Sequence, residues 1–218
     1  MTLWTIQEEK VYLDLLDTGF YHCDFSKSKM HDCKPQYDWL GEQMKKRVGD
    51  PPEGVEYPVW AWHTWWENRR KPDLRNERWG NGWKGVRFVR LEIEIPDSQV
   101  LLSDFDAWSI ILLHGLLSET EEEDRILNEE YDALPPEEQV KMQAINWERA
   151  FDLTPMNNGW SRRGSCIQAT FWELKKEQIR KVTWFTAAFP KPEYIDENVC
   201  FIEEKLPKRK RNAKKMRG

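Results

Sequence analysis

The fold of this chain is decided by residues 86–108, which read VRFVRLEIEIPDSQVLLSDFDAW. Apolar and charged residues alternate from Val89 to Ile95, and a period of two residues is typical of a strand with one buried face. Pro96 then ends the strand, because proline has no amide hydrogen to donate to a neighbouring strand. This segment therefore predicts a half-buried strand, with one face in the core and the other toward water.

The segment that follows this strand is predicted to be mainly helical. After a short strand at 100–102, Ser103 or Asp104 is placed to cap a helix. An acidic helix is expected over 118–134, where the first four residues fit a capping box, and a third helix opens at the proline pair 135–136. The residues predicted to face the core are Phe105, Trp108, Ile111 or Leu112, and Leu116 in the first helix, and Val140, Ala144, Trp147 and Phe151 in the third.

Strands are predicted toward both ends of the chain, around this helical middle. The predicted strands are 3–6, 57–63, 166–172 and 182–189, and helices are predicted from about Glu8 to a stop at Gly19 and over 36–48. Residues 64–85 are expected to be irregular. The strands do not alternate regularly with long helices, so the pattern predicts an α+β fold with a mixed or antiparallel sheet rather than βαβ repeats.

The net charge of -5 is distributed unevenly along the chain. Residues 205–218 contain eight Lys or Arg and no acid, whereas the rest of the chain has 25 basic against 38 acidic residues. We predict a single folded domain over 1–204 and a basic, disordered tail over 205–218. The tail is either a frayed, solubilising end or a neutraliser of the acidic body, or it contacts nucleic acid or an acidic partner. The residues predicted for a nucleic-acid contact are Lys208, Arg209, Lys210 and Arg211.

The sequence also indicates which environments and metal sites to expect. The longest nearly apolar run, 108–117, is about half of the roughly 20 residues that span a bilayer, so no membrane segment is predicted. Residues 1–10 lack the features of a secretion signal, and we therefore expect a cytoplasmic protein. The scattered cysteines indicate reduced thiols. Two His and two Cys within 22–33 are zinc ligands in kind but not in spacing, and no metal is predicted.

Tryptophan is the most unusual feature of the composition, with 13 residues of this type. Six of them lie between Trp60 and Trp83, interleaved with arginine, lysine and histidine. Flat aromatic faces stack on bases or on a nicotinamide ring and arginine neutralises phosphates, so this segment suits a nucleotide or single-stranded nucleic acid. The alternative is that these tryptophans form the core and its lid, with arginines packed over them. No phosphate-binding loop and no nucleophile elbow is present.

Several stretches together resemble a bacterial and phage family that is known only as a domain of unknown function. These stretches are LWTIQ at 3–7, YPVWAW at 57–62, residues 86–108, NWERAFDL at 146–153 and IQATFWEL at 167–174. The resemblance runs from residue 3 to about residue 185.

Three stretches also resemble ADP-ribosyltransferase-like folds, in particular the DNA-modifying toxins of the DarT group. LWTIQ, followed by a helix and Gly19, is similar to their first strand, YPVW to a strand that leads into the NAD-binding region, and QATFW at 168–172 to a strand that carries a glutamate. The resemblance implies a split sheet, a cleft for NAD or a related nucleotide, and transfer of ADP-ribose. The ligand-binding residues that it implies are Trp4, Thr5, Gln7, Trp60, Trp62 and His63.

The sequence departs from this pattern at the catalytic position. Thr170 stands where such a transferase has its glutamate, and Thr5 where many have a histidine. A neutral threonine cannot stabilise a developing positive charge. Either Glu173 reaches the site after a bulge, Gln168 has a binding role, or the protein is a catalytically altered relative; Gln168 and Glu173 are thus the implied catalytic residues.

Two other hypotheses about function stay open at this point. One is a non-enzymatic module that binds nucleic acid or protein through the Trp/Arg-rich segment and the basic tail. The other is that no ligand site exists and the tryptophans only pack the core.

Overall fold

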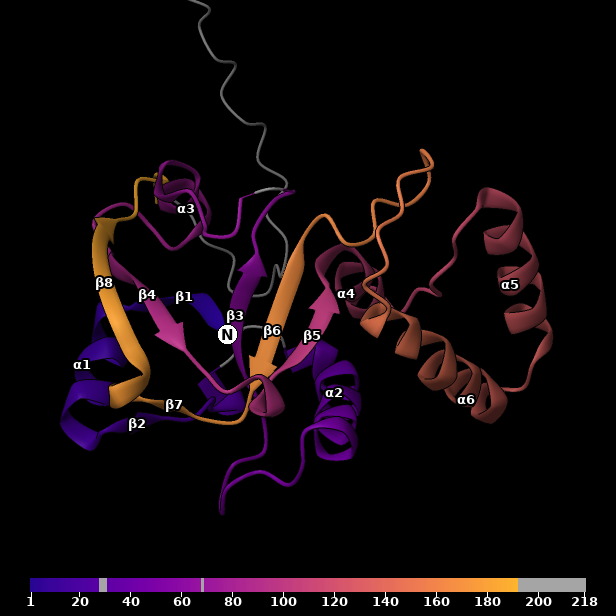
Figure 1. The fold of residues 1–218 in the computed structure, drawn as a ribbon. Helices are drawn as coiled ribbons and strands as arrows, with labels where there is room; N and C mark the ends of the chain where they lie inside the picture. The colour runs from indigo at the N-terminus through magenta and orange to yellow at the C-terminus, as the bar shows by residue number, and fades with distance from the viewer. Residues whose placement is uncertain (28–30, 68, 192–218) are drawn as a thin grey trace, which may run out of the picture.

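The computed structural model describes residues 1–27, 31–67 and 69–191, and its core is a six-stranded antiparallel sheet (Figure 1). The strands lie in the order β5-β6-β3-β1-β4-β8, and β2 pairs with β7 in a separate two-stranded sheet. The strands are β1 (Thr2–Glu8), β2 (Phe20–Tyr21), β3 (Val59–Thr64), β4 (Arg87–Glu94), β5 (Leu101–Asp104), β6 (Ile167–Phe171), β7 (Leu174–Lys175) and β8 (Ile179–Thr186).

Helices surround this sheet and extend from one side of it. The α-helices are α1 (Glu9–Thr18), α2 (Lys34–Arg47), α3 (Leu74–Gly80), α4 (Phe105–Leu112), α5 (Glu121–Ala133) and α6 (Pro136–Asn146). Short 3-10 helices are η1 (Phe25–Lys27), η2 (His31–Cys33), η3 (Asp97–Gln99), η4 (Trp147–Phe151) and η5 (Lys176–Gln178). The predicted α+β class, with an antiparallel sheet in a single domain, is confirmed.

β4, the strand with the alternating pattern, lies inside the sheet. β4 pairs with β1 on one side and with β8 on the other. Val89, Leu91 and Ile93 are fully buried, whereas Glu94 is exposed. Burial of one such aliphatic side chain contributes about 1.5–3 kcal/mol, so this strand anchors the fold as its sequence predicts.

The two faces of the sheet have separate hydrophobic cores. On one face, α1 contributes Leu15 to a cluster with Leu91 and other sheet residues. On the other face, Met44 of α2 and Trp108 of α4 pack into a cluster that also contains Trp147 of η4. Helices therefore cover both faces of the sheet.

Three details of the predicted elements are wrong. Residues 74–80, expected to be irregular, form α3, which starts at the cap residue Asp73. α5 is capped by Thr120 and not by the predicted Ser118, because the Thr120 side chain accepts a hydrogen bond from the Glu123 amide. Val140 is 65% exposed rather than part of the core.

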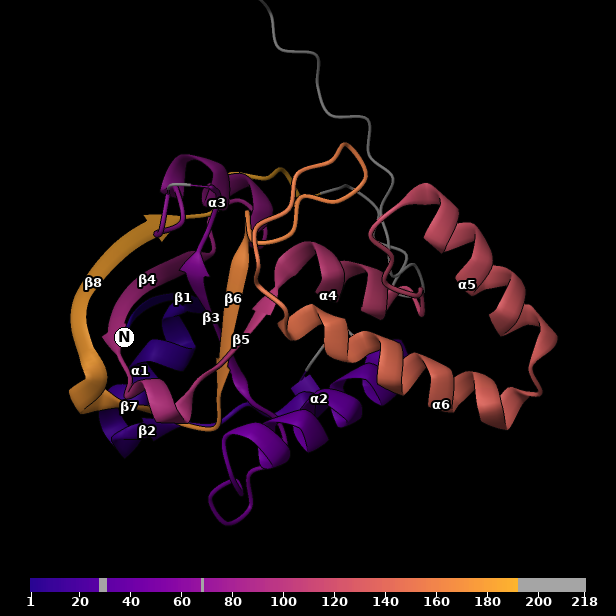
Figure 2. The same cartoon turned by 45° about the vertical axis from the view of Figure 1, so that its right-hand side comes forward.

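α5 and α6 form a pair at the edge of the molecule farthest from β8 (Figure 2). None of the α5 residues is buried, as expected for a solvated acidic helix. Within the described residues, none of the helices has the length and apolar character needed to cross a membrane. The predicted tail at 205–218, with Lys208, Arg209, Lys210 and Arg211, lies outside the described residues.

Candidate functional site

The sheet is split between its two central strands, β1 and β3. β1 pairs with β4 along its whole length, but among the described residues it pairs with β3 only at Trp4 opposite Trp62. Where this ladder stops, Thr5 Oγ1 donates to the carbonyl oxygen of Trp60 at 2.8 Å and accepts from Gln7 Nε2 at 2.8 Å. The hydrogen bond from Thr5 to Trp60 thus links the two strands beside a gap in the backbone pairing, and Gln7, on the same strand as Thr5, orients the Thr5 hydroxyl.

A cavity of about 390 Å³ opens at this split. Its volume lies within the range of small-molecule sites, about 300–1,000 Å³. Five residues predicted from the sequence, on three strands, line it together: Thr5, Gln7, Trp60, Trp62 and Gln168. The other lining residues are Ile6, Tyr21, Cys23, Pro58, Val59, Ala61, Glu77, Gly80 and Asn81.

The two tryptophans of the cavity are held by other aromatic rings. The Trp60 ring lies 5.1 Å from the Trp108 ring, and the Trp62 ring lies 5.2 Å from the Phe105 ring, both measured between centroids. Both tryptophans are half-buried. Because α4 carries the supporting rings, the indole faces are fixed before any ligand arrives.

Gln168 and Thr170 lie on β6 opposite Trp62 and Trp60 but have different surroundings. Gln168 lines the cavity, and its Oε1 atom is buried without a hydrogen-bond partner among the described residues. Thr170 is fully buried, does not line the cavity, and donates from Oγ1 to the Leu101 carbonyl at 3.3 Å. Buried polar atoms normally have partners, and among the described residues Gln168 Oε1 shares this unpartnered state with Gln36 Oε1 and Ser103 Oγ, which lie outside the cavity lining.

α3 adds Glu77 to the cavity, a residue that the sequence predictions missed. Asn81 Nδ2 donates to Glu77 Oε2 at 2.7 Å and to the Glu77 carbonyl oxygen at 2.9 Å. Burial raises the pKa of Glu77, although hydrogen bonds from Asn81 and Trp65 oppose that rise. The signal that could have found it is a carboxylate inside the Trp/Arg-rich segment, close after the helix cap Asp73.

Three predicted site residues lie outside the cavity lining. Trp4 is buried, and its Nε1 donates to Glu92 Oε2 at 3.1 Å. His63 Nδ1 lies 3.0 Å from Thr64 Oγ1, and burial lowers the pKa of His63.

The third of these residues, Glu173, is engaged in ion pairs. Its Oε2 lies 2.6 Å from His22 Nε2, and its Oε1 lies 3.3 Å from Lys175 Nζ. Partial burial favours the neutral acid, but the bonds from His22 and Lys175 outweigh it and lower the pKa of Glu173. The structure therefore brings together Thr5, Gln7, Trp60, Trp62 and Gln168 and leaves Trp4, His63 and Glu173 apart.

A comparison with protein families matches residues 2–180 to the domain of unknown function DUF3841. The chain belongs to this family. The match includes every residue of the cavity lining and confirms the predicted membership in a domain-of-unknown-function family. No curated protein and no solved structure matches the chain.

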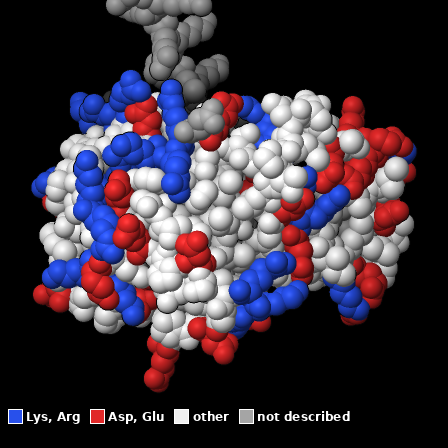
Figure 3. Space-filling model, in the orientation of Figure 1, with Lys and Arg blue, Asp and Glu red and all other residues white. Residues whose placement is uncertain are grey.

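The DUF3841 domain carries a basic surface around α3. Residues 69–90 contain eight Lys or Arg and two acids, and Figure 3 shows positive charge gathered over α3. Part of this positive charge is neutralised by ion pairs. Arg75 pairs with the Asp73 carboxylate, and Arg87 Nη1 lies 2.7 Å from Glu9 Oε1. The helix that contributes Glu77 to the cavity wall thus also carries basic residues on its surface.

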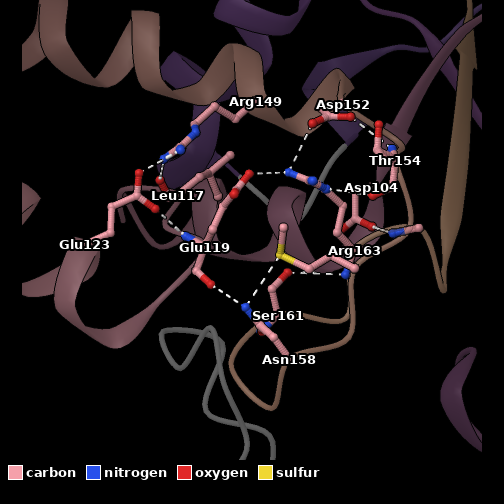
Figure 4. A network of polar contacts seen from close by, with 12 residues as sticks. Asp104, Leu117, Glu119, Glu123, Arg149, Asp152, Thr154, Asn158, Ser161 and Arg163 are labelled. Carbon is pink, nitrogen blue, oxygen red and sulfur yellow. Dashed lines mark hydrogen bonds and ion pairs between the residues drawn. The ribbon is translucent and has the colours of Figure 1, made fainter.

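A second, larger cavity of about 640 Å³ lies between α4, the start of α5 and the loop that precedes β6. Figure 4 shows that two of its arginines, Arg149 and Arg163, are already paired. Arg163 Nη1 lies 2.6 Å from Glu119 Oε1 and 3.1 Å from Asp152 Oδ2. Arg149 Nη2 lies 2.7 Å from Glu123 Oε1. We interpret this network as structural. Arg163 links the loop to Glu119 and Asp152, Arg149 links η4 to α5, and neither of these cations is left free for a ligand.

The described residues contain no group of three His, Cys, Asp or Glu side chains arranged to hold a metal ion.

Proposed function

We propose that the cavity at the split between β1 and β3 binds NAD or a related nucleotide, and that ADP-ribose transfer is its reaction. The observation that carries this proposal is the convergence of five residues around one cavity: Thr5, Gln7, Trp60, Trp62 and Gln168. They come from three separate stretches of sequence, and the resemblance to ADP-ribosyltransferase-like folds implied a ligand-facing or catalytic role for each of them.

The chemistry of the cavity wall supports a nicotinamide ring. Trp60 and Trp62 offer indole faces on which a flat heterocycle can stack. The unpartnered Gln168 Oε1 is a hydrogen-bond acceptor, and the NH2 group of a carboxamide is a matching donor. A ligand amide would relieve the cost of a buried unpaired oxygen, about 1–3 kcal/mol.

The basic surface around α3 supports the phosphate part of the same ligand. A cavity of about 390 Å³ is at the small end of ligand sites and suits one half of a dinucleotide. The diphosphate would then extend beyond the cavity toward α3. Arg78, which follows Glu77 in the chain, and Lys84 have no ion-pair partner among the described residues, and we propose them as its ligands. Lysine and arginine bind phosphate through charge-assisted hydrogen bonds.

NAD binding and cleavage test this proposal directly. Purified protein is expected to bind NAD with a saturable heat in titration calorimetry and with quenching of tryptophan fluorescence, because two tryptophans line the cavity. Incubation is expected to release nicotinamide, measured by liquid chromatography, with ADP-ribose free or attached to an acceptor. The proposal is rejected if neither binding nor release or transfer of ADP-ribose is seen.

A second candidate function is nucleic-acid binding without catalysis. Its specific support is exposed aromatic surface within the basic region: Trp79 is 55% exposed and Trp66 is 41% exposed. Stacking on such side chains contributes about 1–3 kcal/mol per base.

Gel shifts with a single-stranded oligonucleotide separate the two candidates. If the second is correct, affinity falls steeply with salt and on deletion of residues 205–218. Trp79→Ala should weaken oligonucleotide binding and leave NAD binding unchanged, because Trp79 does not line the cavity. Binding that is absent or independent of salt would reject the second candidate.

A further inference from the structure

Glu77 is the only acidic or basic side chain among the described residues of the cavity lining. The described lining contains no other carboxylate and no lysine, arginine or histidine. Burial raises the pKa of the Tyr21 hydroxyl to about 12 and also raises the pKa of the Cys23 thiol, so both groups are neutral. Among the described lining residues, Glu77 is therefore the carboxylate that can stabilise a positive charge developing on a ligand in this cavity.

The Glu77 carboxylate is held in a defined orientation. Both the side chain and the carbonyl oxygen of Glu77 accept from the side chain of Asn81, the residue that caps the C-terminus of α3. Gly80, which follows on the same helix, also lines the cavity and has nothing within 4 Å of the position of a Cβ atom. The end of α3 thus leaves open space next to Gly80, in the same part of the cavity wall that carries the Glu77 carboxylate.

The strand that was expected to supply a carboxylate does not do so. Thr170 is buried under α2 with its hydroxyl bonded to Leu101 and in contact with Met44, and Glu173 is paired with His22 outside the cavity lining. Gln168 lines the cavity but is neutral. The charge missing from β6 is therefore available from α3 alone among the described lining residues.

From these contacts we propose that Glu77 is the catalytic carboxylate of the cavity, an inference that rests on the proposed function. The ligand class is a nucleotide with a positively charged N-glycosidic leaving group, as in NAD. Glu77 stabilises the positive charge that develops on the ribose and accepts a proton from the attacking water or acceptor hydroxyl.

The reaction balances without any further reactant. The bond between ribose C1′ and the nicotinamide nitrogen breaks, and its electron pair leaves with nicotinamide, which becomes neutral. The oxygen of water forms the new bond to C1′, and the water proton passes to the Glu77 carboxylate, which later returns it to solvent. The products are ADP-ribose, nicotinamide and one proton; with an acceptor hydroxyl in place of water, the product is the ADP-ribosylated acceptor.

Glu77→Gln tests this role, because it removes the charge and keeps the size of the side chain. We expect NAD binding to change by less than about threefold while the rate of nicotinamide release falls about 100-fold or more, the scale of general acid–base catalysis. Glu77→Asp keeps a carboxylate and should retain part of the rate. In the wild type, the rate should fall as pH decreases through the raised pKa of Glu77, and the residual rate of Glu77→Gln should lack this dependence.

Glu67→Gln is the matched control, since Glu67 belongs to the same segment, is exposed and does not line the cavity. It should behave as the wild type. A Glu77→Gln variant that binds and cleaves NAD at the wild-type rate would overturn the role of Glu77 and leave the proposed function standing. Parallel loss of binding and rate would also overturn it, because it indicates a binding role. A wild-type protein that neither binds nor cleaves NAD would remove the proposed function itself.

Discussion

Replacing Trp147 with alanine is expected to lower the free energy of unfolding by about 3–5 kcal/mol, the usual cost of removing a large buried aromatic side chain. Trp147 is 6% exposed and belongs to the hydrophobic cluster that also contains Met44 and Trp108. Its ring meets the Trp39 ring edge-on at 5.5 Å, and its Nε1 donates to the Gly115 carbonyl at 2.8 Å. The variant therefore loses packing area and a hydrogen bond and also leaves a cavity.

Ile145→Ala provides the control for this measurement. Ile145 lies two residues earlier and is 75% exposed, so its replacement should change stability by no more than about 0.5 kcal/mol. Urea unfolding followed by circular dichroism gives both values. Equal effects of the two substitutions would contradict the placement of Trp147 in the core and of Ile145 in solvent.

Local sequence periodicity was sufficient to predict most of the sheet. Val89, Leu91 and Ile93 alternate with charged residues, and this alternation directly reports which side chains are buried. The first helix could be predicted in the same way, because Leu15 faces the core and Gly19 ends the helix with a positive φ of 87°. In these segments the local pattern and the tertiary structure agree, so no knowledge of distant contacts was needed.

Elements without a clear apolar face could not be predicted in this way. α3 has seven residues and none of them is buried, so no hydrophobic period marks it. The exposure of Val140 has a related cause: helical spacing groups it with Trp147, but the chain leaves the α-helix after Asn146 and turns into η4. The spacing of an unbroken helix does not apply across that change.

The candidate site was partly predictable, for a reason that lies in the strand pairing. Thr5, Trp60 and Gln168 were named from three motifs, and the order of β1, β3 and β6 in the sheet brings those motifs side by side. Glu77 was missed because it enters the cavity from α3, outside the strands. The ion pair between Glu173 and His22 could not be foreseen, since it joins residues that are 151 positions apart.

Trp62→Ala is expected to weaken NAD binding about 5- to 150-fold if the proposed function is correct. Loss of one stacking face costs about 1–3 kcal/mol, and each 1.4 kcal/mol corresponds to a factor of ten. Trp62 lines the cavity on β3 opposite Gln168, and Phe105 supports its ring. Trp62→Phe keeps a flat face and should restore part of the affinity, which calorimetry can measure without relying on the remaining tryptophans.

Loss of structure must be separated from loss of stacking in this experiment, because the Trp62 ring also packs on Phe105. The melting temperature of each variant therefore has to be measured beside its affinity. Trp184→Ala is a suitable comparison: Trp184 also lies in a strand but is 43% exposed on β8 and does not line the cavity. It should leave the affinity for NAD unchanged. If folded Trp62→Ala bound NAD as tightly as the wild type, the ligand would not lie against this wall, and the cleft between β1 and β3 would lose its main aromatic contact.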